Sequence, residues 1–173
     1  MEKTNPENHN IAITSPIANH ISHIVAKISK IIAEPVKNYL DLGAGSGYIT
    51  QIIVNILKPS DIYVVDFSEI ALKELKKKGF KIIKADLNSE DLSKVLPKEY
   101  FDLITSFEVI EHLFNPDNLL ENVKNLLRPG GYLILSTPNL ASWANRLFLL
   151  MGLKPQHYEL SLKYKVGGLG HNA

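Results

Sequence analysis

The sequence predicts an α/β fold in which helices cover both faces of a doubly wound, mostly parallel sheet. Short apolar runs of strand length alternate along the chain with segments whose apolar residues recur at helical spacing. The runs predicted to be strands are residues 38–42, 62–65, 80–85, 101–107 and 132–136. A glycine-rich turn follows the first run directly, and the 173 residues are enough for one domain with a buried core.

The composition is that of an ordinary globular protein. Charged residues make up 21% of the chain and the formal net charge is +1, so there is no electrostatic case for a nucleic-acid partner. The sequence has no cysteine, which excludes disulfides, cysteine-ligated zinc and a thiolate nucleophile. No segment has the length of a membrane span and the start is polar, so we expect a cytoplasmic enzyme or binding protein.

An N-terminal helix is predicted before the first strand. We expect residues 1–14, which are polar and without pattern, to form a loose arm. Ser15 and Pro16 are residue types preferred at a helix cap and in its first turn. Apolar residues then recur at helical spacing until Pro35, which ends the helix.

The turn after the first strand contains glycine at alternate positions, Gly43, Gly45 and Gly47. Glycine lets the backbone bend sharply and lets a ligand approach the main chain closely. The helix predicted over 49–57 points its first N–H groups at the same place. We therefore expect a nucleotide-like or carboxylate-bearing ligand at the carboxyl end of the first strand, whereas a plain turn would hold none.

This stretch resembles motif I of the class I S-adenosylmethionine-dependent methyltransferases, a family with a Rossmann-like fold. Its spacing is Gly-x-Gly-x-Gly, while dinucleotide-binding proteins have Gly-x-Gly-x-x-Gly. The resemblance implies the strand order 3-2-1-4-5 and a loop packed against the methionine part of the cofactor, S-adenosylmethionine. The residues that it implies for cofactor contact here are Asp41, Gly43, Ala44, Gly45, Ser46 and Gly47.

Acidic residues follow the second and third strands. Asp66 lies about 20 residues beyond the glycine loop, where a carboxylate can accept hydrogen bonds from ribose hydroxyls; the alternative is a helix cap. Phe67 comes next and could lie against the adenine. For Asp86 and Leu87, after the third strand, the resemblance implies contacts with the adenine amino group and ring.

The fourth strand ends in Phe107, which is expected to border the methyl-donor region. Glu108, Glu111 and His112 follow within about one and a half helical turns and resemble the Glu-x-x-Glu-His stretch of ubiquinone-biosynthesis O-methyltransferases. His112 could take a proton from an acceptor hydroxyl while Glu111 orients it. The three side chains could instead hold a divalent metal, or the glutamates could satisfy N–H groups at a helix start.

Two more helices are predicted. Asn115 and Pro116 suit the cap and first turn of a helix that ends at the Arg-Pro-Gly-Gly turn of residues 128–131. This block, with the fifth strand, is another signature of the family and supports the fold rather than the chemistry. A last helix over 139–151 could wall an acceptor pocket or pack on the core.

These features predict methyl transfer to a small-molecule acceptor, at oxygen, by a cofactor-binding domain of residues 15–151 followed by a tail, 152–173. The first rival is an NAD-dependent oxidoreductase, which the loop spacing and the absence of a Tyr-x-x-x-Lys pair disfavour. The second is a non-catalytic S-adenosylmethionine-binding domain or a fragment, because the sixth and seventh strands of the family sheet have no counterpart here. The sheet edge that their absence leaves free predicts that the isolated chain dimerises or is only marginally soluble.

Overall fold

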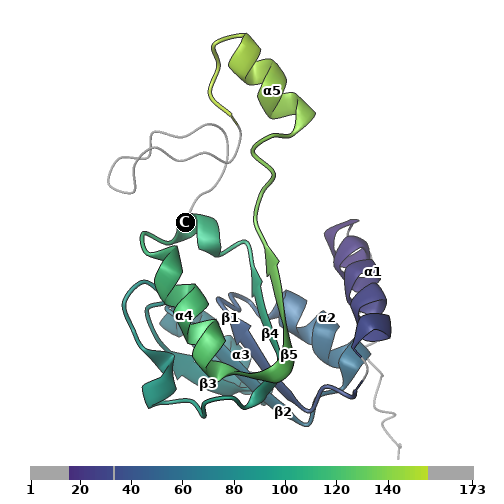
Figure 1. Cartoon of the computed structure of the whole chain (residues 1–173), viewed down its shortest axis with the longest axis vertical. Helices are drawn as coiled ribbons and strands as arrows, with labels where there is room; N and C mark the ends of the chain where they lie inside the picture. Colours follow the sequence, from purple (N-terminus) through teal and green to yellow (C-terminus); the bar gives the residue numbers. More distant parts are fainter. Residues whose placement is uncertain (1–15, 33, 156–173) are drawn as a thin grey trace, which may run out of the picture.

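The structure is a computed structural model that describes residues 16–32 and 34–155 (Figure 1). The predicted arm, the Ser15 cap and most of the predicted tail lie outside the described residues. The strands are β1 Asn38–Leu42, β2 Asp61–Asp66, β3 Lys81–Lys84, β4 Phe101–Phe107 and β5 Leu127–Ser136. The helices are α1 Pro16–Ile31, α2 Tyr48–Leu57, α3 Glu69–Lys77, α4 Pro116–Leu126 and α5 Trp143–Leu150, with short 3-10 turns at η1 Leu92–Lys94 and η2 Ile110–His112.

The five strands are all parallel and follow the order β3-β2-β1-β4-β5, which confirms the predicted sheet. Their carboxyl ends meet at one edge, where sheets of this kind bind ligands. Among the described residues the sheet has no strand beyond β5. At the other side edge, Lys81 and Lys84 of β3 form ion pairs with Asp61 and Glu69, and charged side chains of this kind protect a free edge.

Helices cover both faces of the sheet (Figure 1). On one face α1 and α2 pack on the sheet, where Ile21, Ile53 and Tyr39 share an apolar cluster, and α3 lies beside α2. On the other face α4 contributes Leu119 to a second cluster with Leu40. The central strand β1 is therefore buried from both sides, and full burial stabilises each large aliphatic side chain by about 1.5–3 kcal/mol. No helix in the described segments is long and apolar enough to cross a membrane.

Strand β5 begins earlier than the sequence predicted. Leu127 already pairs with Phe101 of β4, and the next pair joins Tyr132 to Leu103. Residues 128–131 therefore form an irregularity inside the strand rather than a separate turn before it, with Gly130 at a φ of 76°. Since the Arg-Pro-Gly-Gly sequence reads locally as a turn, only the pairing with β4 reveals that the strand extends across it.

Helix α5 also differs from its prediction. It begins at Trp143, where the hydroxyl of Ser142 accepts a hydrogen bond from the Asn145 N–H, four residues later than expected. Figure 1 shows α5 standing away from the body of the domain, beyond the end of β5. Trp143 and Leu150 are 84% and 85% exposed, so the alternative of simple core packing was wrong for the described residues.

At the edge of the sheet where the strands begin, hydrogen bonds to Asp102 join three segments of the chain. We call this group of contacts the clamp. The largely buried carboxylate of Asp102 accepts hydrogen bonds from the N–H groups of Lys37 and Asn38 at 2.8 and 2.7 Å, and from Arg128 Nε at 2.5 Å. Arg128 also reaches Glu34 at 3.3 Å. Burial raises the pKa of Asp102, but the backbone N–H groups of Asn38 and Lys37, and then Arg128, hold it below its ordinary value of 3.8.

Replacement Asp102→Asn is expected to destabilise the fold by about 1–3 kcal/mol at neutral pH, because it removes a charged acceptor from three donors. A pKa that folding lowers means that the unfolded chain binds more protons. The contribution of ionised Asp102 to the free energy of unfolding is therefore complete above its ordinary pKa of 3.8. It is lost as the pH falls through the pKa that Asp102 has in the folded protein. Urea unfolding from pH 7 to pH 3 measures this slope, with exposed Glu121→Gln as control. An unchanged slope in Asp102→Asn would contradict the clamp.

Candidate functional site

A cavity of about 490 Å³ opens at the carboxyl edge of the sheet, a volume within the range of small-ligand sites. It is lined by residues at or just after the carboxyl ends of four strands, β1 to β4. Most of them are residues that the sequence predicted for the site, and the lining is Gly43, Asp66, Phe67, Asp86, Leu87, Asn88, Glu108, Val109, His112 and Leu113.

The glycine loop forms one wall of the cavity and is tied to β2. The N–H groups of Gly43 and Ala44 donate to the carbonyl of Val65 at 2.8 and 3.2 Å. Gly43 has a φ of 78°, and a Cβ there would lie 2.4 Å from Val109 Cγ2. Gly45 has a φ of 52° but no atom within 4 Å of such a Cβ, so its backbone is open to an approaching group.

Of the other loop positions, Gly47 is packed against the protein and Ser46 is exposed. A Cβ at Gly47 would meet Leu75 of α3 at 2.3 Å. The carbonyl of Ser46 accepts a hydrogen bond from Lys78 Nζ at 2.8 Å. Among the predicted contact residues of this loop, only Gly43 lines the cavity itself.

Asp41 lies behind the loop and is not part of the cavity lining. Its buried carboxylate accepts hydrogen bonds from the hydroxyls of Thr50 and Thr105, and the Thr105 hydroxyl also contacts the Tyr39 hydroxyl at 2.7 Å. Burial raises the pKa of Asp41, against the lowering effect of the two threonine hydroxyls. The residue therefore links β1 to the first turn of α2 and to β4.

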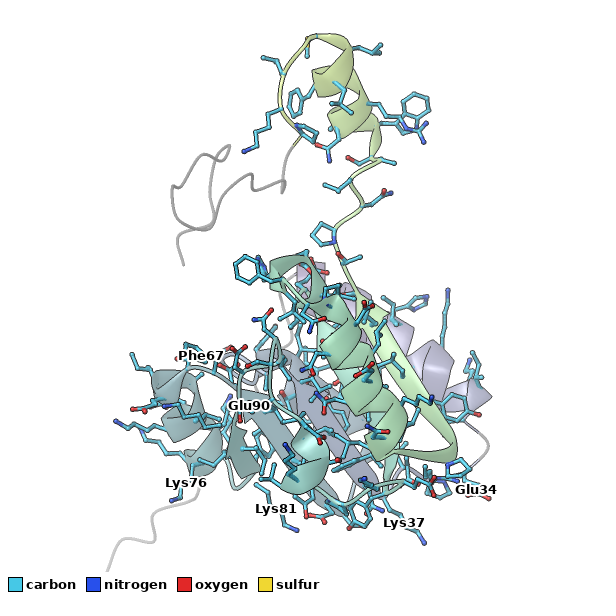
Figure 2. The ribbon with its side chains drawn as sticks, turned by 60° about the vertical axis from the view of Figure 1, so that its left-hand side comes forward. Glu34, Lys37, Phe67, Lys76, Lys81 and Glu90 are labelled. Atoms are coloured by element: carbon cyan, nitrogen blue, oxygen red, sulfur yellow. The ribbon has the colours of Figure 1, made fainter. Side chains whose placement is uncertain are left out.

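Asp66, at the end of β2, connects the glycine loop to the start of α3. Its Oδ2 accepts a hydrogen bond from the Gly45 N–H at 2.7 Å, and its Oδ1 accepts one from the Ser68 N–H at 2.8 Å. Each carboxylate oxygen can accept a second hydrogen bond, so both keep capacity for a ligand hydroxyl. Phe67 beside it is 72% exposed. Figure 2 shows Phe67 at the end of the sheet that faces α5, with Lys37 and Lys81 at the other end.

Asp86, after β3, is held as a carboxylate. Its Oδ1 accepts hydrogen bonds from the backbone N–H and the side-chain Nδ2 of Asn88 at 2.9 and 3.0 Å, and its Oδ2 accepts one from Ser89 Oγ at 3.3 Å. These donors, led by the Asn88 N–H, lower the pKa of Asp86. Leu87 next to it is buried, which places an apolar surface beside an ionised acceptor.

Three asparagines that the sequence reading missed hold the loop that carries Asp86. Asn118 Nδ2 donates to the carbonyls of Leu87 and Glu90 at 2.9 and 3.1 Å. Asn122 Nδ2 donates to the Glu90 carbonyl at 2.8 Å and its Oδ1 accepts from the Leu92 N–H at 2.7 Å. Asn88 is the third. The available signal was the position of Asn118 and Asn122 four residues apart, directly beside the apolar stripe of α4.

The segment after β4 does not continue as a regular helix. Phe107 packs with the cluster on the α1 face and does not line the cavity, although it was predicted to border the methyl-donor region. Glu108 has a φ of 54°, unusual for a residue with a side chain. Its N–H donates to the Ser136 carbonyl at 3.2 Å, and its Oε1 accepts from Ser136 Oγ at 2.7 Å. The next residues form the single 3-10 turn η2.

His112 lines the cavity, whereas Glu111 does not. Their closest side-chain atoms, His112 Nε2 and Glu111 Oε1, are 4.0 Å apart, which is too long for a direct hydrogen bond. In the part of the chain that the structure describes, no three histidine, aspartate or glutamate side chains are grouped as metal ligands. The alternative of a metal held by Glu108, Glu111 and His112 thus has no preformed site here.

Comparison with known proteins adds a family. The sequence model of a family described as a methyltransferase domain matches residues 15–163. Malonyl-[acyl-carrier protein] O-methyltransferase 2 of Ilyobacter polytropus is 30% identical over 117 residues, 66% of this chain and 45% of that protein. Ubiquinone biosynthesis O-methyltransferase of Dechloromonas aromatica is 30% identical over 116 residues, 65% of this chain and 49% of that protein. The chain spans about half the length of these relatives.

A solved structure supports the same fold. The S-adenosylmethionine-dependent methyltransferase from Clostridium acetobutylicum superimposes with a TM-score of 0.62 at 20% identity, over 75% of this chain and 54% of that one. At this identity the likeness bears on the fold alone.

The contact between Gly43 and Val109 predicts a specific pattern of stabilities. Gly43→Ala and Gly45→Ala should each cost about 1–2 kcal/mol of backbone strain, and only Gly43→Ala adds the overlap with Val109. Adding Val109→Ala to Gly43→Ala should remove that overlap. The double variant should therefore lose less unfolding free energy than the two single variants lose in sum. Urea unfolding of the four variants measures this. Equal costs at Gly43 and Gly45 would argue against the close packing.

Proposed function

The chain belongs to the methyltransferase-domain family, and we propose that it binds S-adenosylmethionine in this cavity and transfers the methyl group to a small-molecule acceptor, at oxygen. The observation that carries the proposal is the meeting of Gly43, Asp66, Asp86 and His112 around one cavity, although they follow β1, β2, β3 and β4. The O-methyltransferase names of the similar relatives support oxygen as the methylated atom.

The residues present fit the chemistry of such a cofactor. Asp66 keeps free acceptor capacity for ribose hydroxyls, because its present partners use one lone pair of each oxygen. The ionised Asp86 suits the amino group of adenine, with Leu87 and Phe67 as apolar surfaces for the ring. The open backbone at Gly45 suits the close approach of the methionine part. When bound, S-adenosylmethionine supplies an electrophilic methyl group on a sulfonium centre.

The chain's own contribution to the reaction is alignment of the acceptor and removal of its proton. The rate of an in-line displacement rises most when the acceptor atom and the methyl donor are held in the right geometry. His112 faces the cavity from η2 and is the assigned general base for an acceptor hydroxyl. Glu111, whose Oε1 lies 4.0 Å from Nε2 of His112, is assigned to orient the imidazole.

The partners of the chain follow from the same features. The acceptor is a small molecule, and the sequence gives no charge pattern for a nucleic acid. The predicted homodimer stays a prediction: the outer edge of β5, which has no neighbouring strand among the described residues, is the surface proposed for it.

Titration calorimetry of the 173-residue chain tests cofactor binding. S-adenosylmethionine and S-adenosylhomocysteine are expected to bind and NAD is not. Asp66→Ala should weaken both by about tenfold or more, because it removes a charged hydrogen-bond acceptor. Asp61→Ala, at the amino end of the same strand β2, is the matched control and should leave both affinities unchanged. If neither methyl-cycle ligand binds to the folded chain, the proposed function fails.

His112→Ala tests the base. Incubation with S-adenosylmethionine and a set of phenols, carboxylic acids, amines and thiols, read by mass spectrometry, is expected to give methyl ethers or esters. The variant should lose about 100-fold or more in turnover while its affinity for S-adenosylhomocysteine stays the same. Methylated amines or thiols as the main products would overturn oxygen as the acceptor atom. Binding without any product in the wild-type chain would favour the non-catalytic rival.

A further inference from the structure

The cavity-lining residues between β4 and α4 are fixed at both ends. At the amino end, Glu108 is tied to Ser136 of β5 through backbone and side chain. At the carboxyl end, Asn88 Oδ1 accepts hydrogen bonds from the N–H groups of Phe114 and Asn115 at 2.7 and 3.4 Å. Residues 109–113, which lie between these attachments, include the cavity-lining Val109, His112 and Leu113. We refer to them as the acceptor segment.

Asn88 connects this segment to Asp86. While its Oδ1 holds the end of the acceptor segment, its backbone N–H and its Nδ2 both donate to Oδ1 of Asp86. One amide group therefore bonds at the same time to the carboxylate assigned to the cofactor's adenine and to the chain directly after His112 and Leu113. Asn88 itself is half-buried and lines the cavity.

We propose that Asn88 is a positioning residue that couples occupation of the adenine end of the cavity to ordering of the acceptor segment. This inference rests on the proposed function and goes beyond it, since it assigns an order of events. A group that donates to Asp86 restrains the carboxylate, and the hydrogen bonds from the backbone N–H and the Nδ2 of Asn88 pass this restraint to Asn88. Part of the conformational entropy that the acceptor segment must lose is then already lost before an acceptor arrives. This favours binding of the cofactor before the acceptor.

The neighbouring amide of Asn118 provides a matched control. Its Nδ2 donates to the carbonyls of Leu87 and Glu90, so it steadies the same loop as Asn88. Its side chain, however, forms no bridge from Asp86 to the Phe114 N–H. Loss of Asn118 should loosen the loop without cutting the coupling.

Hydrogen exchange measured by mass spectrometry on the full 173-residue chain tests the proposal. Adenosine is the probe, because it carries the adenine and ribose but no methionine part that could touch the acceptor segment. Saturating adenosine is expected to slow exchange in residues 109–115 of the wild-type chain by about fivefold or more. Exchange in residues 43–47 reports occupancy of the site in every variant, because the Gly45 N–H donates to Asp66, the residue assigned to the ribose that adenosine carries.

Two replacements of Asn88 separate coupling from simple support. Asn88→Asp keeps an acceptor for the Phe114 N–H but replaces the donor to Asp86 with a second carboxylate, so adenosine should protect 43–47 and no longer slow 109–115. Asn88→Ala should exchange quickly at 109–115 with or without adenosine. Asn118→Ala at saturating adenosine should keep the wild-type response.

The outcomes distinguish this inference from the proposed function. Three results would each overturn the coupling and leave cofactor binding intact. Adenosine could still slow exchange at 109–115 in both Asn88 variants, or it could fail to do so in Asn118→Ala. It could also fail to slow exchange at 109–115 in a wild-type chain whose residues 43–47 are protected. If neither region responds to adenosine or to S-adenosylhomocysteine in the wild-type chain, the proposed function falls and the coupling falls with it.

Discussion

The buried carboxylate of Asp41 is the constraint on which the rest of the site depends. It lies in the central strand, with one oxygen bonded to Thr50 of α2 and the other to Thr105 of β4. A buried carboxylate without these donors would lower the stability of the fold. The two hydrogen bonds therefore hold β1, α2 and β4 in one relative arrangement. Residues 43–47 must span from β1 to α2 within that arrangement, and the positive φ angles of their glycines follow from it.

The three carboxylates of the cavity are each fixed by hydrogen bonds from the protein, and backbone N–H groups are donors to two of them. Asp66 is held by the N–H groups of Gly45 and Ser68, and Asp86 by that of Asn88 together with side-chain donors. Glu108 bonds to Ser136, in the neighbouring strand. Because each carboxylate oxygen can accept more than one hydrogen bond, these anchored carboxylates keep acceptor capacity for a ligand.

Much of the fold could be predicted from local sequence, because apolar runs, glycine turns and capping residues act within a few positions. The cavity positions of Asp66 and Asp86 followed from their places after strands. The features that local sequence did not reveal depend on distant parts of the chain. The side of the sheet that Phe107 faces is set by the alternation of β4 against α1, and the early start of β5 is set by pairing with Phe101. The role of Asn88 required the position of Phe114, 26 residues away.

The two asparagines of α4 also limit how that helix can sit on the sheet. Asn118 and Asn122 occur beside Leu119 and Val123. Asn122 is almost fully buried, and its side chain bonds to the Glu90 carbonyl and to the N–H of Leu92, the first residue of η1. A small rotation of α4 about its own axis would keep much of its leucine surface covered but would strand these amides without partners. Leucine packing alone tolerates several rotational settings of α4 about its axis. The hydrogen bonds of the two amides are compatible with one setting, so they fix the rotation of the helix on the sheet.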